Sequence, residues 1–480
     1  MQKKFVANLA LLLLLNFLIK PFWIFGIDRS VQNMLPLDYG MYFALFNFSL
    51  LFNIVLDLGI TNFNNRNIAQ NNHLLSEYFS GITIFKGLLF LVYLIITLVV
   101  GFVLGYDSER FYVLLFLSFN QFLISFVQYL RSNITALQLF RLDSLLSVLD
   151  KSLMILFCSL LLWGNFFSFS FTILHFIYAQ TLAYLITALI VFAIVWAKSA
   201  HFTLKIDIPF LKKIIRQTFP YALLILTMVF YYRIDAVMLD FMLDDGEKEV
   251  SIYAQAYRLM DAFNQIGVLF AGLLLPMFAY LIKEKQDLAP LVKLSFSLIF
   301  LMAITIAAIT FNFSEKIMNL LYHFDTDSSS KVVVVLMFCF VFIATSYIFG
   351  TLLTANGSLA SLNKIALIGV LINVGLNSFL IPEYKALGAA YASLITQCII
   401  IIGQLYLSKK IFSFTINYFF IFRMIIFLTA LFFTLYWIAK LMDGLILQIG
   451  ISLLCSFILG LVLKIINPKE IMRILLKSEI

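Results

Sequence analysis

Long apolar stretches separated by short polar segments run along the whole chain. Read with a window of about 19 residues, this pattern predicts about fourteen membrane-spanning helices, because about 20 apolar residues in a helix cross about 30 Å of hydrocarbon. Continuous apolar runs such as Leu9 to Leu15 are typical of helices rather than of the alternating strands of a membrane barrel. The predicted spans are 5–27, 39–62, 80–104, 110–131, 143–163, 171–197, 214–240, 250–281, 290–312, 331–353, 362–381, 387–408, 418–439 and 444–466.

Composition excludes a soluble protein. The 480 residues are 63% hydrophobic and 12% charged, about half the charged fraction of a soluble domain. No loop is longer than about 20 residues, so the pattern leaves no room for a soluble catalytic domain. The four cysteines and four histidines have no metal-ligand or disulfide spacing, and no nucleotide loop or nucleophile motif is present. We therefore predict a carrier rather than an enzyme, with no catalytic residue, metal or cofactor.

Lys and Arg predict the orientation. When connecting segments are assigned alternately to the two sides, about 21 of the 33 fall on one side and about seven on the other. This bias predicts an even number of spans with both termini in the cytoplasm, and it places the acidic loop Asp240 to Glu249 outside. The net charge of +8 then reflects topology rather than nucleic-acid binding. The first apolar segment is predicted to be a retained helix, since it is long and has no small-residue cleavage site.

Five cations lie inside the predicted spans: Lys20, Lys86, Lys151, Arg233 and Arg258. Each costs about 2.5 to 3.5 kcal/mol near mid-bilayer, so several together favour a wet cavity or an anionic cargo. The topology predicts Lys20, Arg233 and Arg258 in the outer half of the membrane. It predicts Lys86 and Lys151 in the inner half. The alternative is that each snorkels to the headgroups, because each lies within about 13 Å of a span end.

Acidic residues near these cations are predicted counter-ions. Asp261 lies three residues after Arg258 on one helical face, whereas Asp235 is about 200° around the helix from Arg233. Asp57 is predicted to meet Lys86 or Lys151. Asp150 is expected to point away from its neighbour Lys151.

The longest basic connection, Lys198 to Arg216, predicts the division of the chain. We expect an N-terminal lobe of six spans (1–197), a cytoplasmic linker (198–213), a second lobe of six spans (214–408), and two further helices with a cytoplasmic tail (409–480). A weak internal echo between Gly40 to Ala44 and Ser251 to Ala256 supports related lobes, although chance similarity of two aromatic-rich segments explains it as well.

The chain also resembles a known family over most of its length, through motifs that occur in the same order. The motifs are Leu37-Asp38-Tyr39-Gly40-Met41-Tyr42, Asp57-Leu58-Gly59-Ile60-Thr61-Asn62-Phe63-Asn64-Asn65-Arg66, Arg233-Ile234-Asp235-Ala236-Val237-Met238-Leu239, Ile252-Tyr253-Ala254-Gln255-Ala256-Tyr257-Arg258-Leu259, Leu273-Leu274-Leu275-Pro276-Met277, Ala355-Asn356-Gly357, Asn373, Asn377, Ile381-Pro382 and Leu387-Gly388-Ala389-Ala390. They resemble the Wzx-type polysaccharide and O-antigen flippases of the multidrug/oligosaccharidyl-lipid/polysaccharide (MOP) exporter superfamily.

The resemblance implies an all-α membrane protein whose two six-helix lobes form a V-shaped, MATE-like arrangement, with two C-terminal helices added. It implies a flippase that moves an undecaprenyl-diphosphate-linked oligosaccharide from the inner to the outer leaflet of the bacterial cytoplasmic membrane, for cell-surface polysaccharide biosynthesis. On this hypothesis Lys20, Arg233 and Arg258 bind the diphosphate, and Lys86, Lys151 and Arg66 attract it at the cytoplasmic entrance. Asp57, Asp235 and Asp261 hold the cations when the cavity is empty.

Two other functions stay open at this point. A cation-coupled multidrug extruder of the same superfamily needs an acidic cavity, which the excess of intramembrane cations disfavours. A glycan polymerase or ligase needs a long external loop, and the predicted outer loops are short. Besides the glycan and membrane lipids, open candidates for partners are a glycan polymerase, other export components, and H⁺ or Na⁺ as a coupling ion.

Overall fold

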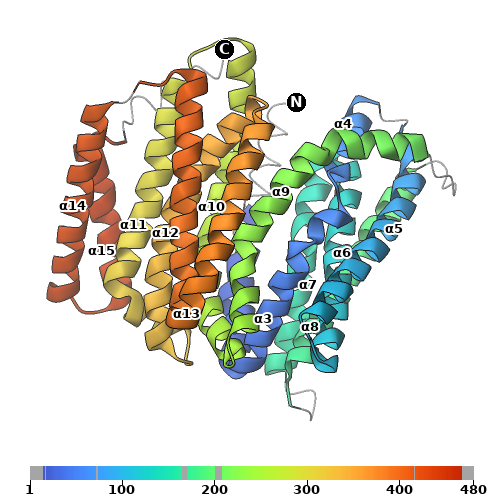
Figure 1. The fold of residues 1–480 in the computed structure, drawn as a ribbon, viewed down its shortest axis with the longest axis horizontal. Coiled ribbons are helices and arrows are strands. Elements are labelled where there is room, and N and C mark those ends of the chain that lie inside the picture. Colours follow the sequence, from blue (N-terminus) through green and yellow to red (C-terminus); the bar gives the residue numbers. More distant parts are fainter. Residues whose placement is uncertain are drawn as a thin grey trace. The chain divides into compact units, whose positions relative to one another are not determined.

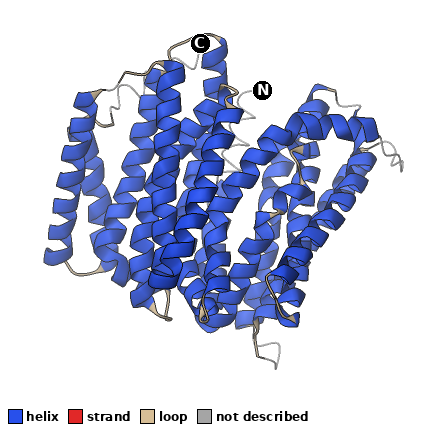
Figure 2. Cartoon of the chain, viewed as in Figure 1, coloured by secondary structure: helices blue, strands red, loops and turns tan. Residues whose placement is uncertain are grey.

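The structure is a computed structural model and describes residues 14–16, 18–71, 74–164, 170–199, 208–415 and 417–466. These residues form helices and connecting loops, without a strand (Figure 2). The elements, labelled as in Figure 1, are η1 (Trp23–Asp28, a π-helical turn), α2 (Arg29–Met34), α3 (Pro36–Leu51), η2 (Asn53–Leu56, a 3₁₀ turn), α4 (Ile60–Gln70), α5 (Leu74–Val103), α6 (Ser108–Ala136), α7 (Phe140–Trp163), α8 (Ile173–Lys198), α9 (Ile208–Met242), α10 (Gly246–Lys283), α11 (Ala289–Leu321), α12 (Thr326–Ala355), α13 (Leu359–Phe412), α14 (Tyr418–Leu441) and α15 (Leu445–Val462).

The described helices bear out the predicted membrane fold. Eleven are long and apolar enough to cross a membrane, or twelve if the pair Pro36–Leu51 and Asn53–Gln70, bent by 53°, is one span. α13 contains a further reversal, because Lys385 has a non-helical φ of 52° and a Cβ on Gly388 would lie 2.2 Å from the carbonyl oxygen of Leu380. Its 54 residues therefore supply the two predicted spans 362–381 and 387–408. The predicted count of fourteen stays approximate.

The first predicted span differs from the structure at its end. Residues 5–13 lie outside the described residues, but the helical path continues beyond residue 27 through η1 and α2 to Met34. A π-helical turn adds a residue to the helix without ending it. Lys20 therefore lies further from the end of its span than the sequence predicted.

The chain divides into two compact units, Met1–Ser251 (unit 1) and Ile252–Ile480 (unit 2). α9 and the first turn of α10 belong to unit 1. The predicted lobes, their boundary at the 198–213 linker and their V-shaped arrangement stay predictions. Residues 200–207 of that linker lie outside the described residues, and from Ile208 onward the chain is helical.

Close helix contacts in unit 1 depend on small residues and on a buried core. α3 packs against both α6 and α9. At Gly40 in α3 the backbone of α10 comes so close that a Cβ would lie 1.9 Å from the carbonyl oxygen of Glu247. A hydrophobic core that includes Ile60, Phe79 and Tyr129 joins α4, α5 and α6. These contacts fix the helices that carry the polar residues of unit 1.

Unit 2 is built around α11, α12 and α13, with α14 and α15 packed on α11 (Figure 1). The hydroxyls of Thr305 in α11 and Ser456 in α15 are hydrogen-bonded at 2.5 Å. Phe432 of α14 packs edge-on against Phe311 of α11. The two C-terminal helices are therefore an integral part of unit 2.

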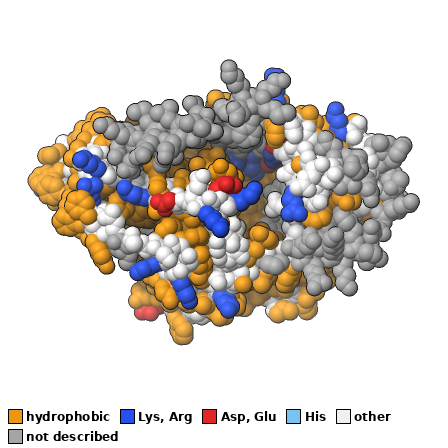
Figure 3. Space-filling model, turned by 90° about the horizontal axis from the view of Figure 1, so that it is seen from above, with side chains coloured by type: hydrophobic (Ala, Val, Ile, Leu, Met, Phe, Trp, Pro, Cys, Tyr) orange, Lys and Arg blue, Asp and Glu red, His pale blue; other side chains and the backbone are white. Residues whose placement is uncertain are grey.

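Charges at the two ends of unit 2 follow the predicted asymmetry. The described lysines at the end where α10, α12 and α15 finish are exposed, and Figure 3 looks at this end, with Lys and Arg side chains in blue. They are Lys283, Lys285, Lys293, Lys364, Lys409, Lys410 and Lys464. The opposite end has the four exposed lysines Lys316, Lys331, Lys385 and Lys440. The predicted cytoplasmic side is thus the more basic end of this unit.

The glycine contact at Gly40 provides a test of the packing in unit 1. We expect Gly40→Ala to lower the thermal unfolding midpoint in detergent, because the methyl group displaces backbone rather than a flexible side chain. Gly375→Ala in α13 is the matched control, since a Cβ there meets no atom within 4 Å, and alanine favours the helix by up to about 1 kcal/mol. Equal effects of the two substitutions would contradict the close approach of α3 and α10.

Candidate functional site

Lys20 and Lys151 form the centre of a cationic cluster inside unit 1. The Lys151 ammonium donates to the hydroxyl oxygen of Tyr184 at 3.0 Å and lies 5.3 Å from the centroid of the Trp23 ring. The charges of Lys151, Asp150 and Arg131 lie close enough to act on Lys20. The structure thus brings these two lysines of different spans close together, and their predicted depths in the membrane stay predictions.

Carboxylates partly neutralise this cluster. Asp150 Oδ2 lies 3.8 Å from the Lys151 ammonium, so the expectation that these neighbours point apart is wrong. Arg131 pairs with Asp143, with 2.8 Å between Nε and Oδ1. Lys20, Lys151 and Arg131 thus lie near the carboxylates of Asp150 and Asp143, among groups that the protein partly shields from water.

Arg233 is placed by the packing of α9 on α3. It is half-buried, and its Nη1 donates a long hydrogen bond of 3.4 Å to Oδ1 of Asn47 in α3. Asn47 is itself fixed, since its Nδ2 donates to the Phe43 carbonyl at 2.7 Å. Asp235, two residues further along α9, is fully buried. Arg233 is therefore held between two helices of unit 1 rather than at a helix end.

Asp57 and Lys86 meet at the break between α3 and α4. The sequence left Lys86 and Lys151 as possible partners of Asp57. In the structure Asp57 pairs with Lys86, with 2.5 Å between Oδ1 and Nζ. Lys86 is 1% exposed, and its ammonium also donates to the Leu56 carbonyl at 2.8 Å and to the Ser125 hydroxyl at 3.0 Å. An ammonium has three protons, so these three acceptors engage all of them.

The remaining predicted residues lie elsewhere. Arg66 is exposed on α4. Arg258 and Asp261 are both half-buried on α10, in unit 2. The structure thus brings together Lys20 with Lys151 and Lys86 with Asp57, and the grouping of Arg233 with Arg258 and Asp261 stays a prediction.

Sequence reasoning missed one charged cluster, formed by Arg110, Asp240 and Glu247. The Arg110 guanidinium contacts Asp240 at 2.5 Å and Glu247 at 3.0 Å, and so ties the start of α6 to the connection between α9 and α10. The Asp240 side chain is 1% exposed. Burial first, and then the Asp240 carboxylate, raise the pKa of the neighbouring phenol of Tyr106. The signal in the sequence was the predicted location of Arg110 and the acidic loop on the same side of the membrane.

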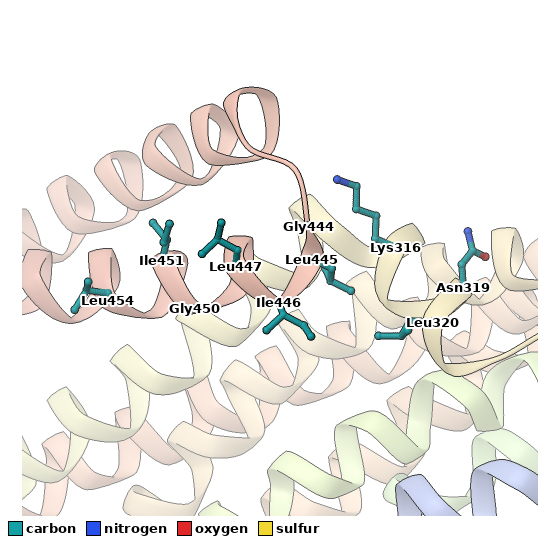
Figure 4. Close-up of a pocket in the computed structure, with 10 residues that line it drawn as sticks. All are labelled: Lys316, Asn319, Leu320, Gly444, Leu445, Ile446, Leu447, Gly450, Ile451 and Leu454. Atoms are coloured by element: carbon teal, nitrogen blue, oxygen red, sulfur yellow. The ribbon is translucent and has the colours of Figure 1, made fainter.

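A groove of about 1030 Å³ lies in unit 2 between the end of α11 and the start of α15 (Figure 4). Its lining is mainly aliphatic, including Leu447, Ile451 and Leu454. Lys316, at its edge, donates to Oε1 of Gln448 at 3.2 Å. Its lining residues include no carboxylate, thiol or histidine, and the described residues contain no group of three or more His, Cys, Asp or Glu that could hold a metal. The groove resembles a lipid-facing surface rather than a reaction site.

Comparisons with known proteins agree with this arrangement. The family described as polysaccharide biosynthesis protein matches residues 6–282. The capsular polysaccharide biosynthesis protein CapF of Staphylococcus aureus is 26% identical over 268 residues, which are 53% of this chain and 65% of that protein. The match therefore covers slightly less than two thirds of this relative.

Two solved structures have a similar fold. The lipid II flippase MurJ, in an inward closed conformation, matches with a TM-score of 0.73 and 16% identity over 94% of this chain and 98% of its own. An inward-facing multidrug resistance MATE family transporter of the MOP superfamily matches with a TM-score of 0.62 and 16% identity. The match covers 84% of this chain and 96% of that transporter. These identities are low, so the likeness concerns the fold alone, and it confirms the predicted MATE-like fold.

The Arg110 cluster generates a test by a double-mutant cycle. We expect Arg110→Ala to destabilise the protein by about 3 to 5 kcal/mol, because it leaves the buried Asp240 carboxylate without its partner. Asp240→Asn in the same chain should recover most of this loss, since it removes the unpaired charge. The measurement is thermal or denaturant unfolding of the four proteins in detergent. Additive losses would show that the two side chains do not interact.

Proposed function

Because the chain belongs to the family of polysaccharide biosynthesis proteins, we propose that it is a flippase. It moves a lipid-linked glycan from the inner to the outer leaflet of the bacterial cytoplasmic membrane, and its termini lie in the cytoplasm. The multi-pass helical structure and the fold similar to a lipid II flippase support this function. An undecaprenyl-diphosphate-linked oligosaccharide is the proposed cargo.

The observation that carries the proposal is the cationic cluster around Lys20 and Lys151. Like charges repel most strongly where the dielectric constant is low, so two lysines brought together inside apolar helices require an anion or a carboxylate nearby. Asp150 meets this need in part. A diphosphate supplies two or more negative charges and several strong acceptors, and its hydrogen bonds with Lys are charge-assisted.

The other predicted residues have proposed roles along the same path. Arg233, fixed between α3 and α9, and Arg258 on α10 are further phosphate ligands, and exposed Arg66 attracts the cargo at the cytoplasmic end. Asp235 and Asp261 balance these cations when cargo is absent. The lipid tail stays in the bilayer while the glycan crosses through a wet cavity, so a chain of this kind needs no soluble domain.

Depletion of the protein in its native host tests the function directly. We expect lipid-linked oligosaccharide units to accumulate on the cytoplasmic leaflet, because they are made there and cannot cross. The measurement is the accessibility of the glycan to an impermeant probe in right-side-out and inverted membrane vesicles. Accumulation on the outer leaflet would instead indicate a polymerase or ligase and would overturn the proposal.

Neutralisation of the cluster tests the proposed phosphate ligands. We expect Lys151→Gln and Arg233→Ala to reduce glycan export at least about tenfold, since the loss of a charge-assisted hydrogen bond costs about 1.5 to 3 kcal/mol. Lys151→Arg and Arg233→Lys should retain part of the activity. Arg141→Ala, which changes an exposed arginine at the start of α7, is the matched control. Wild-type export by the Lys151→Gln and Arg233→Ala proteins at normal membrane levels would contradict this assignment.

A further inference from the structure

The span that contains α3 and α4 is broken in a manner that frees backbone oxygens. Between the two helices, η2 leads to Leu58 with φ 46° and Gly59 with φ 80°, both left-handed. A helical ladder cannot continue through such residues, so carbonyl groups at the break need other donors. The Leu56 carbonyl accepts from Lys86 and from Ser125, and the Leu58 carbonyl accepts from the Thr218 hydroxyl of α9.

The oxygens around the Lys86 ammonium are of the kinds that bind hard cations. One is a carboxylate (Asp57), one a backbone carbonyl (Leu56) and one a hydroxyl (Ser125), at 2.5, 2.8 and 3.0 Å. Metal ions such as Na⁺ and Ca²⁺ favour this set of ligands. The Tyr129 ring, with its centroid 6.0 Å from the ammonium, adds a face that attracts positive charge.

We call the three oxygens around the Lys86 ammonium the cage. The cage is held in place from three helices besides α5, which carries Lys86. Asp57 Oδ1 accepts from both the hydroxyl and the backbone N–H of Thr61, so the same carboxylate caps the first turn of α4. Ser125 extends from α6. Thr218 ties α9 to the neighbouring carbonyl. The cage oxygens therefore keep their positions through bonds that do not involve Lys86.

We propose that the break between α3 and α4 is a monovalent-cation site whose permanent occupant is the ammonium of Lys86. A lysine tethered to α5 performs here what a dissociable Na⁺ does in a broken membrane helix: it neutralises the carboxylate and satisfies the freed carbonyl. The break then keeps its geometry in every ionic condition, and α4 and α9 remain anchored to it. Lys86 is accordingly a positioning residue, and this role does not depend on which cargo the chain carries.

Removal of the tethered cation should turn the site into a Na⁺ site. We expect the thermal unfolding midpoint of purified, full-length Lys86→Ala to lie below that of the wild type in choline chloride. With NaCl at the same ionic strength this midpoint should rise by about 1 to 2 °C for each tenfold increase in Na⁺ above the dissociation constant. The wild type should show no such difference between the salts. Lys364→Ala, which removes an exposed lysine, is the control for charge.

The double variant Lys86→Ala/Asp57→Asn decides whether the cage itself binds the ion. We expect it to be insensitive to Na⁺, because the carboxylate that requires a cation is gone. A Na⁺ response that persists in the double variant, one of equal size in the wild type, or none in Lys86→Ala would overturn the proposal.

A second variant keeps the test decisive if Lys86→Ala does not accumulate. Lys86→Ser leaves room for an ion and its water, and its midpoint can be followed in isolated membranes by heating and sedimentation, with the same expectations. If neither single variant accumulates, the double variant is expected to do so, because a neutral cage needs no cation. If the double variant also fails to accumulate, the proposal is overturned.

Discussion

The structure depends on one constraint, which is that polar groups inside hydrocarbon must find their partners within the protein. Long regular helices satisfy this rule with their own backbone. The chain departs from regular helix at the π-helical turn Trp23–Asp28, at the break before α4 and at the reversal within α13. At the π-helical turn, Asp28 accepts from the Tyr39 hydroxyl. At the break before α4, Lys86 and Ser125 donate to the Leu56 carbonyl. Polar side chains thus pair with partners in the protein at two of these interruptions.

The same constraint separates the intramembrane cations into two kinds. Lys86 is saturated by three protein acceptors and is almost wholly buried, as expected for a group that stabilises the fold. Lys151 is only partly neutralised, at 3.8 Å from Asp150, and it shares its surroundings with Lys20. Because a buried charge is costly unless it is paired, the second kind is the one to which we assign the proposed anionic cargo. Residue type alone does not distinguish the two.

Charged and polar side chains join helices within each unit. The described interior of unit 1 contains the Lys86 pair, the Lys20 and Lys151 cluster and the Arg110 network, which ties α6 to the connection between α9 and α10. In unit 2 the hydroxyl pair of Thr305 and Ser456 joins α11 to α15, and the rings of Phe311 and Phe432 pack α11 against α14. α9 connects the sites of unit 1, since it contacts the break through Thr218 and α3 through Arg233.

The sequence by itself determined the membrane class, nearly all the spans, the more basic end and the family, because hydrophobic length and loop charge are local properties that need no knowledge of packing. It also identified Lys20, Lys86, Lys151 and Arg233 as costly residues. Only the tertiary structure decided that Asp57 belongs to Lys86, that Lys20 lies near Lys151, and that Arg110 holds Asp240, 130 residues away. Partners of this kind come from different helices, and their meeting depends on helix breaks and close approaches such as Gly40, which a pattern of apolar residues does not encode.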